Sequence, residues 1–123
     1  MLLRPHAFVQ LGAAASFIYA GGFTFLPDLV FKLHFDAPMT PMLRWLGRGN
    51  SAGILFANLA CLYMEDQVLA AKLLTGFFFM TGFLHPWNAR FGYIDPGLPC
   101  TKLHHFSEVL LLGLTVAGAL SIM

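Results

Sequence analysis

The chain has 123 residues and a formal net charge of +1, and 58% of its residues are hydrophobic while only 11% are charged. An ordinary soluble domain has about 25% charged residues, and so short a chain cannot bury this much apolar surface by itself. The balanced charge excludes a polybasic surface for nucleic acid. We therefore expect one membrane domain over residues 1–123, with no nucleic-acid partner.

The first apolar stretch runs over Phe8–Leu26 and ends at a Leu-Pro-Asp break. Within it Gly12, Ser16 and Ala20 recur at every fourth position, on one face of a helix. After the break, residues 29–35 are a mixture of apolar and basic side chains. This composition predicts a short helix or strand-like segment that lies along the lipid headgroups between the first two helices.

The second helix is predicted over residues 43–64, with its apolar part at Gly49–Met64. Thr40 followed by Pro41 is a good helix start, because a hydroxyl N-cap and a proline at the first helical position both favour it. Arg44 and Arg48 occupy the first two turns. A second stripe of small residues follows at four-residue spacing: Gly49, Gly53, Ala57 and Cys61.

The third helix is predicted over Val68–His85, directly after the short acidic turn at residues 65–67. So short a turn makes the second and third helices antiparallel neighbours. The third helix is bulky because it carries four phenylalanines. The fourth helix is predicted over residues 104–123, with its apolar part at Phe106–Met123 and a third stripe at Gly113, Ala117 and Ser121.

Each of the four stretches, with its flanks, is near the ~20 residues that an α-helix needs to cross a bilayer core. The sequence therefore predicts an all-α, integral membrane four-helix bundle. In lipid, helices associate through close backbone approach, which small residues permit. The three stripes predict close packing of the first, second and fourth helices, with the third helix filling gaps or facing a partner.

The basic residues predict the orientation of the bundle. On the side of the termini and the acidic turn lies Arg4, with Lys72 one turn into the third helix. Five basic residues lie on the side of the long loops: Lys32, Arg44, Arg48, Arg90 and Lys102. By the positive-inside rule, the long loops face the cytoplasm, matrix or stroma, and both termini lie on the opposite side.

Polar residues that could carry chemistry gather on the same basic side. Glu108 lies about two turns into an apolar helix, where a lone carboxylate is costly, and Arg48 is at a similar depth on another helix. We expect the two to form a structural ion pair. His85, His104 and His105 could instead supply ligands to a haem, a chlorophyll or a quinone headgroup. No metal-site spacing and no catalytic constellation is visible.

The layout also carries a family resemblance. Four predicted spans, a break at Leu26-Pro27, an interfacial segment and a helix that opens with residues 44–49 (RWLGRG) together resemble the DoxX-like group of small four-helix membrane proteins. That group includes subunits of membrane oxidoreductases and many members of unknown role. The resemblance implies the four-helix fold and maps no catalytic residue onto this chain.

We therefore expect an accessory, non-catalytic subunit of a larger membrane complex, a hetero-oligomer with other membrane subunits and lipid as its partners. The mitochondrial inner membrane or the thylakoid membrane is favoured. The alternative is a small redox protein that binds haem, chlorophyll or quinone through the basic-side histidines. A third possibility is a scaffold of a lipid or sterol pathway in the endoplasmic reticulum. The expected role needs no cofactor, although a bound lipid, haem or chlorophyll is possible.

Overall fold

A computed structural model describes residues 3–95 and 98–123 of the chain, and these residues are almost entirely helical. The helices are α1 (Pro5–Phe25), α2 (Pro27–His34), α3 (Pro41–Tyr63), α4 (Gln67–Leu84), α5 (Pro86–Phe91) and α6 (His104–Ile122). No strand occurs within the described ranges, and the extended pairing there is a single bridge between Phe35 and Cys100. The prediction of an all-α fold is confirmed.

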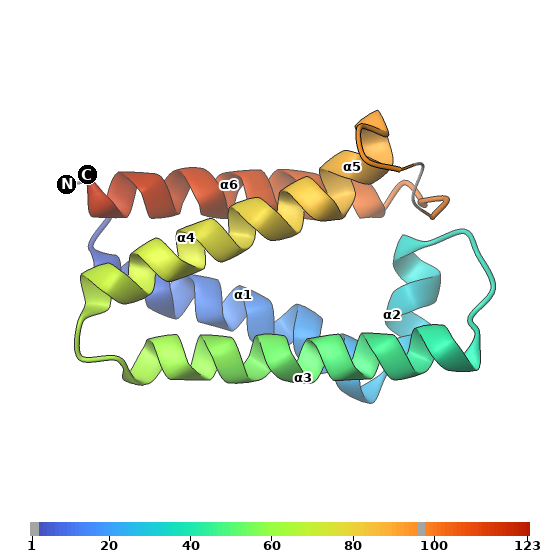
Figure 1. The fold of residues 1–123 in the computed structure, drawn as a ribbon, viewed down its shortest axis with the longest axis horizontal. Helices are drawn as coiled ribbons and strands as arrows, with labels where there is room; N and C mark the ends of the chain where they lie inside the picture. The colour runs from blue at the N-terminus through green and yellow to red at the C-terminus, as the bar shows by residue number, and fades with distance from the viewer. Residues whose placement is uncertain (1–2, 96–97) are drawn as a thin grey trace.

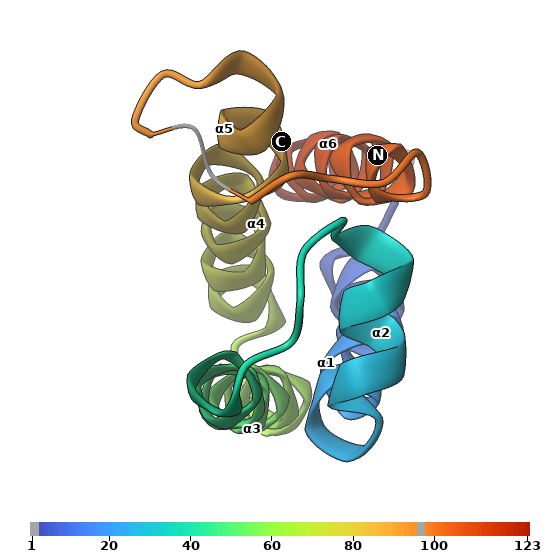
Figure 2. The ribbon, with the colours of Figure 1, turned by 90° about the vertical axis from the view of Figure 1, so that its right-hand side faces the viewer.

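The long helices run between two ends of the molecule that differ in construction (Figure 1). Both termini and the turn between α3 and α4 lie at one end, which we call the terminal end. The short helices α2 and α5 and the long connections lie at the other, which we call the loop end. Figure 2 looks onto the loop end, where α2 lies in front of α1 and the segment that leads into α6 crosses above it.

The central helix of the fold is α4. It packs along α6 and also contacts α1 and α3, while α1 makes its largest contact with α3. Four of its residues are buried in succession along one face: Ala70, Ala71, Leu74 and Phe78. The expectation that this helix fills gaps beside a close bundle of the other three is therefore wrong, because α4 itself contacts α1, α3 and α6.

The hydrophobic core is concentrated at the terminal end. Phe8 and Val9 of α1 are fully buried, and their neighbours in the core include Leu74 and Phe78 of α4 and Leu114 of α6. The rings of Phe8 and Phe78 meet edge to face with centroids 6.1 Å apart. This geometry is favourable for aromatic pairs, because the positive edge of one ring faces the negative face of the other.

Two glycines permit the closest helix contacts in this core. A β-carbon on Gly12 would fall 2.8 Å from the ring of Phe78. A β-carbon on Gly118 would collide with the Thr75 hydroxyl and lie 2.6 Å from the ring of Phe8. The absence of a side chain at these positions is therefore what lets α1, α4 and α6 meet.

The three predicted stripes of small residues have different environments. Gly12, Ser16 and Ala20 are buried against other helices. Gly49, Gly53 and Ala57 on α3 are exposed, whereas Cys61 at the end of that stripe is buried, and a β-carbon on either of these glycines would meet no atom within 4 Å. On α6, Gly113 is exposed, Ala117 half-buried and Ser121 buried, while the buried glycine of that helix is Gly118.

Side chains fix the starts of α3 and α4. The Thr40 hydroxyl accepts a hydrogen bond from the Leu43 backbone N–H at 3.2 Å, as the Thr-Pro signal predicted. The Asp66 carboxylate accepts one from the Leu69 N–H at 2.9 Å. Both satisfy a backbone donor that a helix leaves free in its first turn. The acidic turn thus ends one helix and starts the next in antiparallel direction.

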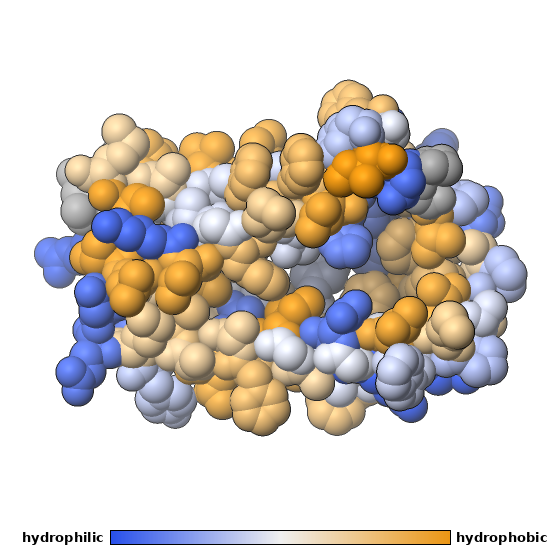
Figure 3. Space-filling view, in the orientation of Figure 1, coloured by the Kyte–Doolittle hydropathy of each residue, from blue (hydrophilic) through white to orange (hydrophobic). Residues whose placement is uncertain are grey.

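The outer surface of the helices is largely apolar, as Figure 3 shows for one face. Three helical segments are long and apolar enough to cross a membrane: Pro5–Phe25, Gln67–Phe91 and His104–Ile122. With its 23 residues α3 has the length, but two arginines near its start and several amide and hydroxyl side chains lower its hydropathy. Four helices were predicted to span the membrane from their length, and three of these segments also have the apolar composition that a span requires.

Candidate functional site

Among the described residues, no hydrogen bond or ring contact joins His85 to His104 or His105, the three histidines named from the sequence. His85 is exposed and caps the end of α4. His104 and His105 are adjacent at the start of α6, so they point to different sides of the helix. His104 is buried, whereas His105 is exposed. Within the described residues no group of three or more His, Cys, Asp or Glu side chains could hold a metal ion.

Glu108 is held by partners at the loop end. Arg90 of α5 donates to its carboxylate at 2.6 Å, and His105 lies 3.1 Å from the other carboxylate oxygen. Arg90 also contacts the His105 ring at 2.6 Å. The Trp87 indole N–H donates to the backbone carbonyl of Glu108 at 3.1 Å. These contacts tie α5 to α6.

The predicted pairing of Arg48 with Glu108 is therefore replaced by another. Arg48 donates through Nε to the Thr24 carbonyl at 3.2 Å, near the end of α1. The sequence placed Glu108 at the right depth for an ion pair, but the cation comes from α5. The sequence does not signal that this short helix contacts α6, because α5 follows the break at Pro86 and its contact with α6 is tertiary.

A second polar cluster, which sequence reasoning did not assemble, lies between α1, α2 and the start of α6. The His34 ring of α2 is 5.7 Å from the Tyr19 ring of α1 and 5.6 Å from the His104 ring, centroid to centroid. Tyr19 also lies nearly parallel to Phe106, at 6.4 Å. We call Tyr19, His34 and His104 the histidine–tyrosine cluster.

Backbone bonds between distant segments bring His34 beside His104. The Thr101 N–H donates to the His34 carbonyl at 3.0 Å, and the Thr101 hydroxyl donates to the Leu33 carbonyl at 2.5 Å. The Asp36 N–H donates to the Pro99 carbonyl at 2.8 Å. These bonds fasten the connection before α6 to the end of α2. No local pattern signals this pairing, because the segments are more than sixty positions apart in the sequence.

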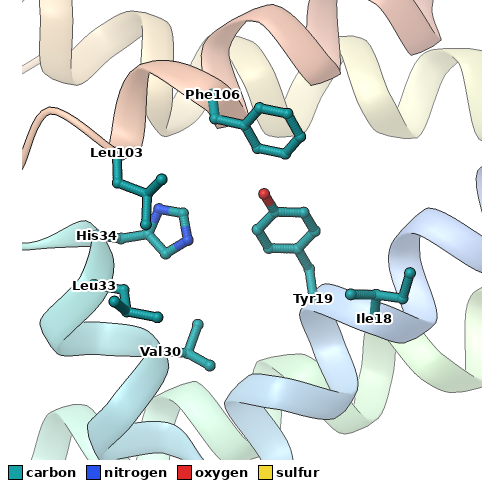
Figure 4. A pocket seen from close by; sticks show the side chains of 7 residues that line it. All are labelled: Ile18, Tyr19, Val30, Leu33, His34, Leu103 and Phe106. Carbon is teal, nitrogen blue, oxygen red and sulfur yellow. The ribbon is translucent and has the colours of Figure 1, made fainter.

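The cluster borders a pocket of about 420 Å³ (Figure 4). Its lining residues are Ile18, Tyr19, Val30, Leu33, His34, Leu103 and Phe106. In the figure the His34 ring stands between Leu103 and Tyr19, and the Tyr19 hydroxyl points toward Phe106. The pocket is open on one side. Its lining residues include one histidine and no lysine, arginine, aspartate or glutamate. Its volume lies in the range of ligand sites in proteins, about 300–1,000 Å³.

Three parts of the cluster have no hydrogen-bond partner among the described residues, although the Nδ1 atom of His104 lies 3.4 Å from the Ser107 hydroxyl oxygen. The Nε2 atom of His104 is fully buried and unpaired. Within the residues that the structure describes, neither the Tyr19 hydroxyl nor a ring nitrogen of His34 makes a hydrogen bond. A buried polar group without a partner costs about 1–3 kcal/mol. The cluster thus holds hydrogen-bonding capacity that the protein itself does not use.

Burial lowers the pKa of His34 from its usual value of 6.5. The cause is desolvation, which disfavours the charged imidazolium. At pH 7 the His34 ring is therefore neutral and offers one N–H donor and one nitrogen acceptor. The site can therefore donate a hydrogen bond to a neutral oxygen group and accept one from it.

Comparison of the chain with models of known protein families, with curated proteins and with solved structures gave no match.

Proposed function

We propose that this chain is an integral membrane protein in which α1, α3, α4 and α6 form a four-helix bundle and α2 lies at the bilayer interface. Large apolar side chains are exposed on all four long helices, among them Ile18, Phe56, Leu73 and Val116. An apolar surface that extends around a small protein is unfavourable in water and suits contact with lipid. The three helices with membrane-spanning length and composition support the same location.

The orientation is proposed from the charges at the two ends. The loop end carries Lys32, Arg44, Arg48, Arg90 and Lys102, and both termini lie at the other end (Figure 1). We infer that the loop end faces the matrix, stroma or cytoplasm. A mitochondrial inner or thylakoid membrane is the favoured location, with the endoplasmic reticulum as the alternative.

Within that membrane we propose that the chain is an accessory, non-catalytic subunit of a larger complex. The observation that carries this proposal is the exposure of Gly49, Gly53 and Ala57 on α3, since no other helix among the described residues comes within 4 Å of a β-carbon added at either glycine. Small residues at this spacing allow a second helix to approach closely in lipid. A subunit role is also what the resemblance to DoxX-like proteins implies for some members of that group.

The proposal is tested by native gel electrophoresis of the source membrane in a mild detergent, with mass spectrometry of the band that contains this chain. Migration with a large assembly supports the subunit role and identifies the partners. Migration near its own mass of 13.6 kDa, or as a small homo-oligomer, contradicts it.

A variant pair then tests the stripe itself. Gly53→Leu should release the chain from the assembly, because the larger side chain blocks close approach of a partner helix. Gly76→Leu is the matched control, since Gly76 is an exposed glycine of α4 that lies in none of the three stripes and meets no atom within 4 Å. Equal retention of both variants in the large band would exclude the α3 stripe as the contact.

The alternative role, binding of a haem, chlorophyll or quinone, has a narrower basis than the three histidines suggested. His85 caps the end of α4 without lining the pocket, and His105 is engaged with Glu108. Only His104 adjoins a pocket, through its contact with His34. A ligand-binding role would therefore rest on the histidine–tyrosine cluster.

A further inference from the structure

The pocket beside the histidine–tyrosine cluster combines apolar walls with unused polar groups on two sides. Tyr19 belongs to α1 and His34 to α2, and both line the pocket without hydrogen-bond partners among the described residues. The ring of His104 lies 5.6 Å from the His34 ring, centroid to centroid, and its Nε2 atom is buried and unpaired. A buried polar atom in a native fold normally has a partner, either in the protein or in a bound molecule. The pocket therefore has the properties of a ligand site.

The rim of the pocket indicates how a ligand enters. Ile18 is 75% exposed and Phe106 is 55% exposed, and both line the open side. An apolar rim on the outer surface of membrane helices admits a molecule that is dissolved in lipid. A tail that follows the head group can remain outside, between the exposed side chains.

The absence of charged side chains in the pocket limits which kinds of head group it can bind. No lysine, arginine or carboxylate lines it, and burial keeps the His34 imidazole neutral at pH 7. A phosphate or carboxylate head would enter without a cation to pair with, and an ammonium head without an anion. The head group that fits is neutral and carries oxygen.

We propose that this pocket binds a lipid-soluble quinone or its hydroquinone through Tyr19 and His34. A ring with oxygen at two positions can meet polar groups on two walls, whereas the single hydroxyl of a sterol meets one. A neutral imidazole and a phenol can each donate to a quinone carbonyl or accept from a hydroquinone hydroxyl. The aromatic faces of Tyr19 and Phe106 suit a flat ring. The inference rests on the membrane location proposed above and does not depend on the accessory role.

The test uses the full chain, purified in mild detergent, and titrates it with a decyl-substituted dimethoxy-methyl-1,4-benzoquinone by isothermal calorimetry. Binding should saturate at one molecule per chain. Decylbenzene, which has the same tail and no oxygen, should neither saturate a site nor displace the quinone. Equal binding of the two probes would overturn the proposal, because it would show that the polar cluster takes no part.

Three variants locate the site. Ile18→Trp fills the open side from an exposed position and should weaken binding about tenfold or more. Tyr19→Phe and His34→Phe each remove one hydrogen-bonding group and should weaken it about fivefold, which is what one hydrogen bond of about 1 kcal/mol contributes. Unchanged affinity in all three would overturn the proposal.

Matched controls separate the site from the fold. Val116→Trp places the same ring on an exposed position of α6 outside the pocket, and His85→Phe removes an exposed histidine. Both should bind as the parent chain does. Helical circular dichroism reports folding independently of binding. If Ile18→Trp loses both helicity and binding, it is replaced by Ile18→Phe, which fills the same rim with a smaller ring.

Competition identifies the class of ligand. A sterol or a diacylglycerol that displaces the quinone at lower concentration would overturn the quinone assignment in favour of a neutral lipid. Carbonate extraction of the source membrane tests the location separately. Release of the chain by carbonate would contradict the membrane location while the calorimetric result stands, so the two failures are distinguishable.

Discussion

The two ends of this molecule are held together in different ways. At the terminal end, Phe8, Leu74 and Phe78 pack over glycines with hardly a charged group between the helices. At the loop end, α2 and α5 are fastened by charged and polar contacts: Arg44 pairs with Asp28 and Arg90 pairs with Glu108. The pocket and the unpaired Nε2 atom of His104 lie at the loop end.

This difference suggests a division of labour within one small fold. Close packing requires side chains that match in shape, so the terminal end tolerates little change. Polar contacts near an interface can be rearranged at lower cost, because water can replace a lost partner. A ligand site is therefore more readily accommodated at the loop end, where the helices are not sealed against each other.

The largest effect is expected from emptying the terminal core. Phe8→Ala should lower the free energy of unfolding by about 3–5 kcal/mol, because it removes a fully buried ring and leaves a cavity. Unfolding in mixed detergent micelles, followed by circular dichroism, measures the loss. Phe25→Ala is the control, since that ring is 76% exposed at the end of the same helix. If both variants lost a similar free energy of unfolding, the terminal core would not be the main source of stability.

Adding a single carbon at the closest helix contact should come next. Gly118→Ala should cost about 1–3 kcal/mol, because the new methyl group collides with Thr75 and Phe8. Gly113→Ala, on the same helix, meets no atom within 4 Å and should be neutral or stabilising by up to about 1 kcal/mol. The same unfolding assay compares the pair, and a stable Gly118→Ala variant would contradict the close approach of α1, α4 and α6.

The glycines show how far the sequence alone can reach. The four-residue spacing identified Gly12, Ser16 and Ala20 correctly as a packing face. It also selected Gly113, although Gly118 is the glycine that α6 buries. Periodicity indicates that a helix has a small-residue face, but which face turns inward depends on partners that are distant in sequence.

The polar groups show the same limit. Apolar length and turn residues predicted helices over the four apolar stretches, and the start of α3 followed from Thr40 and Pro41. The sequence did not predict that Arg90 rather than Arg48 meets Glu108, or that His34 meets His104. In each pair, the two residues are brought together by a connection between helices, and tertiary contacts set the path of that connection.

A double-mutant cycle tests the ionic fastening of the loop end. Arg90→Ala and Glu108→Ala should show a coupling energy of about 1 kcal/mol in unfolding, since the arginine side chain is 44% exposed and the pair is partly screened. The cycle of Arg48→Ala with Glu108→Ala is the control and should give additive losses. Coupling to Arg48 of the same size would contradict the observed pairing.

A pH effect should follow from the buried histidine. Burial lowers the pKa of His34 below its ordinary value of 6.5, so above pH 6.5 both the folded and the unfolded chain carry a neutral ring. Below pH 6.5 the unfolded chain binds a proton that the folded chain resists, and stability should fall progressively as the pH falls. Tyr19 and His104 face His34 from α1 and α6.

The unfolding midpoint between pH 8 and pH 5 measures this effect. His34→Phe should reduce the dependence on pH, whereas His85→Phe, which removes an exposed histidine, should leave it as in the parent chain. A pH dependence that is identical in the His34→Phe variant would show that the ring is not held in its neutral form.

The smallest effect is expected at the surface pair of α2 and α3. Arg44 donates to both oxygens of Asp28, at 2.9 and 3.0 Å, and this hydrogen bonding holds the pKa of the carboxyl below its ordinary value of 3.8. The contribution to stability is therefore present above pH 3.8 and is lost as the pH falls below it. Because the carboxylate is 62% exposed, salt should screen the pair.

Asp28→Asn should thus shift the unfolding midpoint slightly at low ionic strength and hardly at all in high salt. The comparison to make is with Asp36→Asn, an acidic residue of the following connection for which no ion pair is found among the described residues. A large, salt-independent loss in Asp28→Asn would mean that α2 is fastened to α3 as rigidly as the core helices are to one another. In that event, the loop end would be a second sealed region, and the pocket beside α2 would have to admit its ligand without any movement of that helix.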